Sequence, residues 1–218
     1  MRKIALLLGF ILIALQSCKK DPCENTVCLN GGECLDGTCQ CPAGFSGPDC
    51  SAENKCYNVT CFNNGICLNG TCDCADGYSG PTCLDQITPR KIFIKEVRVK
   101  NFPATDNGAG WDLTSGADLY LDIYQEPNGS APLASFKNAY YENATPGVTY
   151  KFTFNGTGLE LTNMDVRYGF VLMDNDTDAD DQVGGLIGYI YSNTNGFPPT
   201  QNWVNGDFTF EIDMTYAW

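Results

Sequence analysis

Histidine is absent from this 218-residue sequence, and basic residues are scarce, with 13 Lys and Arg against 26 Asp and Glu. Without His, the chain lacks the commonest general base, the Ser-His and Cys-His nucleophile pairs and the usual zinc ligand. The acidic excess disfavours nucleic acid, whose phosphates need a basic patch, and direct attraction to anionic lipid headgroups. No pair of carboxylates stands out as a glycosidase pair beyond the acidic run discussed below. We therefore expect a protein that is not an enzyme.

Long apolar runs are also missing, apart from one near the start. Residues 4–15 are apolar and follow the basic Met1-Arg2-Lys3. This run is shorter than the ~20 residues that a membrane-spanning helix needs. A basic start followed by a short apolar run is typical of a secretory signal peptide, which we assign to residues 1–17.

The end of this segment, Leu15-Gln16-Ser17-Cys18, resembles the lipobox of bacterial lipoproteins. The following Lys19-Lys20-Asp21 is similar to the charged start of Bacteroidetes-type members of that family. The resemblance implies cleavage before Cys18, a lipid on its thiol and a tether over residues 18–22. It also implies a cell-envelope location, anchored to the outer membrane and facing either side. An ordinary cleaved signal with an unrelated Cys remains the alternative.

The cysteine count agrees with a lipidated Cys18. The chain has 13 Cys, an odd number, and assigning Cys18 to a lipid leaves twelve, enough for six disulfides. Such pairing needs an oxidising compartment, which an exported protein reaches. Loss of Arg2 and Lys3 with the signal leaves eleven basic against 26 acidic residues, a net charge of −15.

Those twelve cysteines form an internal repeat, over residues 23–50 and 56–83. Each unit is too short to build an adequate apolar core, so crosslinks typically worth 2–4 kcal/mol each must hold it. Spacing alone leaves fifteen connectivities open in each unit. The cysteines recur 33 positions apart: Cys23, Cys28, Cys34, Cys39, Cys41 and Cys50, then Cys56, Cys61, Cys67, Cys72, Cys74 and Cys83.

The segments from Cys41 to Cys50 and from Cys74 to Cys83 resemble the C-terminal half of epidermal-growth-factor-like (EGF-like) modules. The residues before each first cysteine match poorly the acidic pattern of calcium-binding EGF-like modules, so we expect calcium in neither. The modules would form a short stalk or a contact surface. The family pairing, first to third, second to fourth and fifth to sixth, implies Cys23–Cys34, Cys28–Cys39, Cys41–Cys50, Cys56–Cys67, Cys61–Cys72 and Cys74–Cys83.

Residues 84–90, with Pro89, read as a linker to a domain over 91–218. Apolar residues alternate with polar ones over 118–123, 149–154 and 207–216, which predicts antiparallel strands with one wet face. In the first strand the apolar phase slips near Lys95-Glu96, which predicts a β-bulge. Asn-Gly pairs supply turns. The fold class is all-β: two disulfide-rich modules followed by an antiparallel β-sandwich.

Five carboxylates fall between Asp174 and Asp181, in a loop between two apolar strands. Without a cation they would repel one another, whereas calcium takes six to eight oxygen ligands from such side chains. We therefore expect a calcium-binding loop, with a solvated acidic turn as the alternative. Asp112 and Asp118 bracket a second loop, just before a strand.

Together these two loops resemble the calcium-binding loops of the C-two domain (second conserved region of protein kinase C). One strand before the first loop and a strong final strand are similar to the circularly permuted variant. Asp178 falls on no ligand position of the family. The resemblance implies ligands at Asp112, Asp118, Asp174, Asp176 and either Asp180 or Asp181.

The sequence thus predicts a lipid-anchored binding or adhesion protein. Two EGF-like modules would present a calcium-binding sandwich to a protein, glycan or lipid partner. The alternative is a structural spacer or assembly subunit without metal-dependent binding. A further loop, Phe197-Pro198-Pro199, is either a ligand platform or a packed surface loop.

Overall fold

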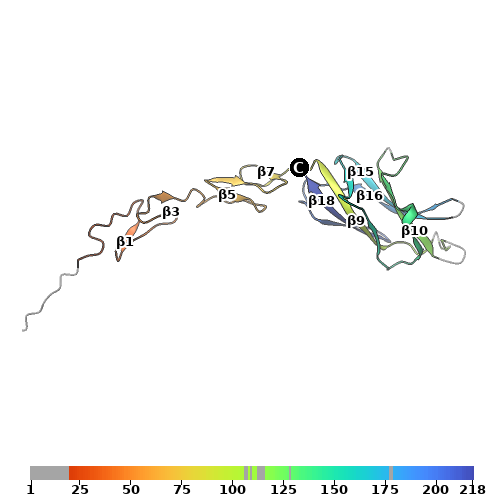
Figure 1. Ribbon diagram of the computed structural model, residues 1–218, viewed down its shortest axis with the longest axis horizontal. Helices are drawn as coiled ribbons and strands as arrows, with labels where there is room; N and C mark the ends of the chain where they lie inside the picture. Colours follow the sequence, from red (N-terminus) through yellow and green to blue (C-terminus); the bar gives the residue numbers. More distant parts are fainter. Residues whose placement is uncertain (1–19, 106–107, 109, 112–115, 128, 177–178) are drawn as a thin grey trace, which may run out of the picture. The chain divides into compact units, whose positions relative to one another are not determined.

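The computed structural model describes residues 20–105, 108, 110–111, 116–127, 129–176 and 179–218. The predicted signal and Cys18 lie outside these residues. The described chain contains strands and one short 3-10 helix, η1 (Lys137–Ala139), and none of its helices is long and apolar enough to cross a membrane. It divides into two compact units: Met1–Thr60 with Cys67–Cys72, and Cys61–Ile66 with Asp73–Trp218. The all-β prediction is confirmed (Figure 1).

Short hairpins and disulfides build the two cysteine repeats. Their strands are β1 (Glu33–Leu35), β2 (Thr38–Gln40), β3 (Phe45–Ser46) and β4 (Ala52–Glu53), then β5 (Ile66–Leu68), β6 (Thr71–Asp73), β7 (Tyr78–Ser79) and β8 (Asp85–Gln86). Cys61 and Cys72 are disulfide-bonded, as the resemblance implied. The other bridges also follow the family pairing: Cys23–Cys34, Cys28–Cys39, Cys41–Cys50, Cys56–Cys67 and Cys74–Cys83.

One glycine in each repeat packs against an aromatic ring from a later segment of the chain. A Cβ on Gly44 would lie 3.1 Å from the Tyr57 ring, and one on Gly77, 33 positions later, would lie 2.3 Å from the Phe197 ring. Both glycines have positive φ, +90° and +87°. The carbonyl of Gly44 accepts from the Asn54 N–H and that of Gly77 from the Ile87 N–H, each at 2.8 Å. Only glycine suits these positions, because a side chain would be strained and would clash.

Two antiparallel five-stranded sheets form the C-terminal sandwich. In the first, the order is β11-β10-β15-β16, and β12 also pairs with β10; in the second, it is β13-β9-β18-β17, and β14 also pairs with β9. The bounds are β9 (Lys91–Asn101), β10 (Ala117–Gln125), β11 (Ala134–Ser135), β12 (Tyr141–Ala144), β13 (Tyr150–Thr153), β14 (Leu159–Leu161), β15 (Arg167–Asp174), β16 (Asp181–Tyr189), β17 (Thr200–Asn205) and β18 (Phe208–Ala217).

Alternate residues of both sheets meet in one apolar core. The first strand of the sandwich, β9, pairs with the last, β18 (Figure 1). Glu96 pairs with Asp213 but Ile94 with Met214, so Lys95 is the extra residue of a bulge, as predicted. Fully buried side chains of the core include Ile92, Ile94, Leu119, Leu121, Ile123, Phe170, Leu172, Phe210 and Ile212.

The segment expected to be a linker contains β8, and its Gln86 side chain is held by the sandwich. Gln86 donates through Nε2 to the Tyr191 hydroxyl at 3.1 Å and the Ser192 carbonyl at 3.0 Å, and its Oε1 accepts from the Gly196 N–H at 3.0 Å. Phe197 is a packed residue of the loop that follows. Its ring contacts those of Tyr78, Tyr191, Tyr216 and Trp218.

Arg98 of β9 organises the outer face of the second sheet. Its guanidinium donates to Glu96 at 2.8 Å, to Glu211 at 2.9 Å and to Asp213 at 2.7 Å. Hydrogen bonds from Arg98 lower the pKa of Glu96 and of Asp213, and those from Lys100 and Arg98 lower that of Glu211. The Arg98 side chain is only 18% exposed, so these contacts are partly shielded from water.

We expect Arg98→Met to lower the free energy of unfolding by about 2 kcal/mol at neutral pH, because three partly buried carboxylates lose their shared cation. The carboxylates have lowered pKa values in the folded state, so their contribution is present above the ordinary pKa of about 4 and is lost as pH falls below it. The difference between variant and wild type should therefore shrink towards pH 3. Urea denaturation across this pH range measures both effects.

Lys91→Met is the matched control on the same strand. Lys91 pairs with Glu160 at 2.8 Å, and both side chains are more than 40% exposed. Exposed pairs contribute little, so this variant should lose less than about 1 kcal/mol and show no comparable pH dependence. Equal losses in the two variants would show that Arg98 has no special role.

Candidate metal centre

Three acidic residues lie at the ends of neighbouring strands in the first sheet. Leu119 of β10 pairs with Asp174 of β15, and Asp174 pairs with Asp181 of β16. The Asp118 N–H donates to Asp174 Oδ1 at 2.6 Å, and the Asn175 N–H donates to the Asp118 carbonyl at 2.9 Å. The described ends of β10 and β15, each beside one of the acidic stretches that the sequence linked only by resemblance, are therefore in contact.

The Asp174 carboxylate is fully buried at this end. Taking a carboxylate out of water is costly unless hydrogen bonds or opposite charge compensate for it. The Asp118 carboxylate is half-buried, and its Oδ1 accepts from the Asn143 N–H of β12 at 2.9 Å. Each of the two aspartates thus holds a backbone N–H of a neighbouring strand in place.

Asp180 is engaged by a cation from within the chain. Its carboxylate forms an ion pair with Lys137 of η1 and accepts from the Tyr120 hydroxyl at 2.7 Å. The hydrogen bond from Lys137 is the main cause of a lowered Asp180 pKa, and burial raises the pKa of Tyr120. Of the two alternatives left open by the sequence, Asp181 is the exposed residue in register with Asp174. Asp181 is therefore the better candidate ligand.

Of the remaining expected ligands, the structure describes only Asp176. Asp112 lies outside the described residues, as does Asp178, while Asp176 is half-buried. Within the described residues, no group of three or more His, Cys, Asp or Glu side chains is placed to hold a metal ion. Hard carboxylate oxygens suit calcium, and the ends of β10, β15 and β16 bring such residues near one another. The calcium site stays a prediction.

Sequence patterning missed the burial on the outer face of β10. Alternation predicted that Tyr120 and Asp122 face water, but they are only 3% and 5% exposed. Asp122 Oδ2 accepts from the Tyr124 hydroxyl at 2.9 Å, while the buried Oδ1 has no hydrogen-bond partner in the described part of the chain. Burial, with the bond to Asp122, raises the pKa of Tyr124 to about 12. Tyr120 and Tyr124, which flank Asp122 on the same face of the strand, were the available signal, since their large rings can cover the carboxylate between them.

No protein-family model matches the chain. A mouse (Mus musculus) protein, "EGF-like repeat and discoidin I-like domain-containing protein 3", is 45% identical over 53 residues, which are 22% of this chain and 11% of that protein. The chain thus matches about a tenth of that relative's length. The likeness agrees with the disulfide-rich repeats, and such disulfides are typical of exported proteins.

Several solved C2 (C-two) domains are similar in structure. One described as "Structure of a C2 domain" is 18% identical with a TM-score of 0.39, covering 59% of this chain and 98% of that one. A C2 domain of a plant Extended Synaptotagmin 1 is 12% identical with a TM-score of 0.38, covering 60% and 97%. A C2 domain protein from Ramazzottius varieornatus is 13% identical with a TM-score of 0.35, covering 59% and 88%. The fold is defined by the sheet order and strand register described above, and these likenesses add no further argument.

We expect Lys137 and Asp180 to couple by about 0.2–1 kcal/mol, a small but measurable amount, because the Lys137 side chain is half-exposed and water screens the pair. A double-mutant cycle with Lys137→Met and Asp180→Asn, followed by urea denaturation in chelator, measures the coupling. Asp207, exposed in the turn between β17 and β18, is the control partner and should show none. If the coupling free energy were zero in both cycles, the Lys137–Asp180 ion pair would not contribute to stability, and the prediction would be wrong.

Proposed function

We propose that the chain is an exported, lipid-anchored binding or adhesion protein in which two EGF-like modules present a calcium-binding β-sandwich to an extracellular or envelope partner. The observation that carries the proposal is the hydrogen bond from the Asp118 N–H to the buried Asp174 carboxylate. It supports the proposal because it joins the ends of β10 and β15, from which the carboxylates of Asp118 and Asp174 could share a divalent cation.

In this proposal Asp118, Asp174 and Asp181 hold the ion, with Asp176 and Asp112 completing the set. Bound calcium would supply positive charge that offsets the repulsion between carboxylates and ties the two loops together. Asp180 takes no part, since Lys137 already neutralises it.

The N-terminal features support presentation at the cell envelope. Twelve disulfide-bonded cysteines stabilise the repeats. The thirteenth, Cys18, ends the lipobox-like segment and is the proposed attachment point of the lipid. We propose no catalytic role, because the His-free sequence leaves few groups suited to acid–base chemistry at neutral pH.

A metal-independent spacer or assembly subunit is the second candidate. It is favoured by the Asp180–Lys137 ion pair and by the Asp118–Asn143 hydrogen bond, which hold parts of both loops through contacts within the protein. A calcium effect on stability without any effect on partner capture would favour this alternative.

Calcium titration of the mature chain by calorimetry and thermal denaturation tests the proposal. Extracellular modules bind calcium with Kd values of about 10⁻⁴–10⁻³ M. Calcium at about 100 times Kd should then stabilise the fold by about 2.7 kcal/mol. Absence of both a binding heat and a rise in melting temperature would reject the metal site.

The variants Asp118→Asn and Asp181→Asn should each weaken calcium binding at least about tenfold, because each removes one charged oxygen donor from the ion. Asp165→Asn, which changes an exposed carboxylate near β15, is the matched control and should leave the affinity unchanged. Similar weakening in all three variants would indicate that the overall negative charge of the protein attracts calcium, and that no defined site binds it.

A further inference from the structure

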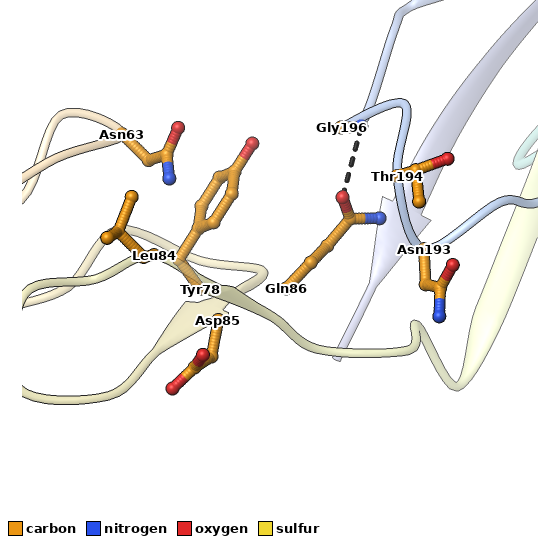
Figure 2. A pocket seen from close by; sticks show the side chains of 8 residues that line it. All are labelled: Asn63, Tyr78, Leu84, Asp85, Gln86, Asn193, Thr194 and Gly196. Atoms are coloured by element: carbon orange, nitrogen blue, oxygen red, sulfur yellow. Dashed lines mark hydrogen bonds between the residues drawn. The ribbon is translucent and has the colours of Figure 1, made fainter.

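A hollow of about 550 Å³ lies in the unit that contains β7, β8 and the sandwich, away from the acidic loops (Figure 2). One wall comes from the second repeat and the other from the loop after β16. It is lined chiefly by Asn63, Tyr78, Asp85, Gln86, Asn193 and Thr194. Its volume is in the range of small-molecule sites.

The walls of this hollow are fixed by contacts within the chain. Gln86 spans from β8 to the loop and holds the Gly196 N–H, as Figure 2 shows. On the same loop the hydroxyls of Ser192 and Thr194 lie 2.9 Å apart. Tyr78 is held edge-to-face against Phe197, with ring centroids 5.4 Å apart. A hollow with preset walls loses less conformational entropy when a ligand binds.

The lining is polar and almost uncharged. Asn63 and Asn193 carry amides, and Tyr78 and Thr194 carry hydroxyls. The Gln86 amide is already used by Tyr191, Ser192 and Gly196, and the Asn63 side-chain nitrogen donates to the Cys83 carbonyl at 2.8 Å, so Gln86 shapes the wall and Asn63 offers chiefly its oxygen. Amides and hydroxyls both donate and accept hydrogen bonds, which matches a ligand rich in hydroxyl groups. The one charged residue of the lining, Asp85, points to the opposite side of β8 from Gln86 in Figure 2. No Lys or Arg lines the hollow among the described residues, which makes it unsuited to phosphate or carboxylate ligands.

We propose that this hollow binds a neutral carbohydrate of one or two sugar units. The exposed Asn193 and Thr194 would hydrogen-bond sugar hydroxyls from one side, and the Tyr78 ring and hydroxyl would contact the sugar from the other. A peptide fits less well, because the main apolar side chain of the lining, Leu84, is 59% exposed and forms no enclosed subsite. The site is separate from the proposed calcium loops, so its occupancy needs no metal.

The test uses the full mature chain in chelator, with neutral disaccharides (maltose, cellobiose, lactose and N,N′-diacetylchitobiose) as probes. Two-dimensional NMR follows the side-chain amides of Asn63, Gln86 and Asn193, up to about 50 mM sugar, since open wet sites are weak. We expect at least one disaccharide to shift these signals in a saturable way. Absence of any saturable shift from all four sugars would overturn the proposal.

The double variant Asn193→Ala/Thr194→Ala should weaken that binding at least about tenfold, because it removes two directional hydrogen-bonding groups. Asn205→Ala, which removes an exposed amide at the end of β17, is the matched control and should bind as the wild type does. Equal loss in both variants, or tighter binding of an acetylated dipeptide amide than of any sugar, would also overturn the assignment. Binding that persists in chelator separates this site from the calcium proposal.

Discussion

The hydrogen bond between the Asp118 N–H and the buried Asp174 carboxylate sets the geometry of the loop end of the sandwich. A buried carboxylate is tolerated only where donors or cations meet it, so the strand that carries Asp174 must lie close to the backbone of β10. The pairing of β15 with β16 places Asp181 in register with Asp174. The contact between the described ends of β10 and β15 therefore depends on one desolvated charge and its partner.

Much of the architecture could be predicted because its signals are local. Cysteines repeating every 33 residues define two crosslinked units, and alternating apolar residues define strands of the sandwich. The slip at Lys95-Glu96 marked a bulge because moving one residue in a strand reverses which face each side chain takes. In each case neighbouring residues carry the information.

Contacts between distant residues were beyond sequence reasoning. Lys137 meets Asp180 across 43 positions, so no spacing rule could separate Asp180 from Asp181 as a candidate ligand. Asp122 has the pattern of a residue on a wet face, yet it is buried beside a tyrosine. The segment after Cys83 looked like a linker because it contains Pro89, but Gln86 joins it to a loop more than 100 residues away. Side-chain partners of this kind exist only once the chain has folded.

Gly44 and Gly77 give the two repeats the same kind of contact with the segment that follows each of them. Each accepts an aromatic ring from whatever follows it, a tyrosine of the next repeat in one case and a phenylalanine of the sandwich in the other. Each repeat therefore supplies the glycine of this contact, and the segment that follows needs to supply only one aromatic ring at the matching position. A gene encoding such a chain could gain or lose whole repeats and still connect its last unit to the same terminal domain. The number of repeats before the sandwich is thus a property that evolution could change without redesigning the sandwich.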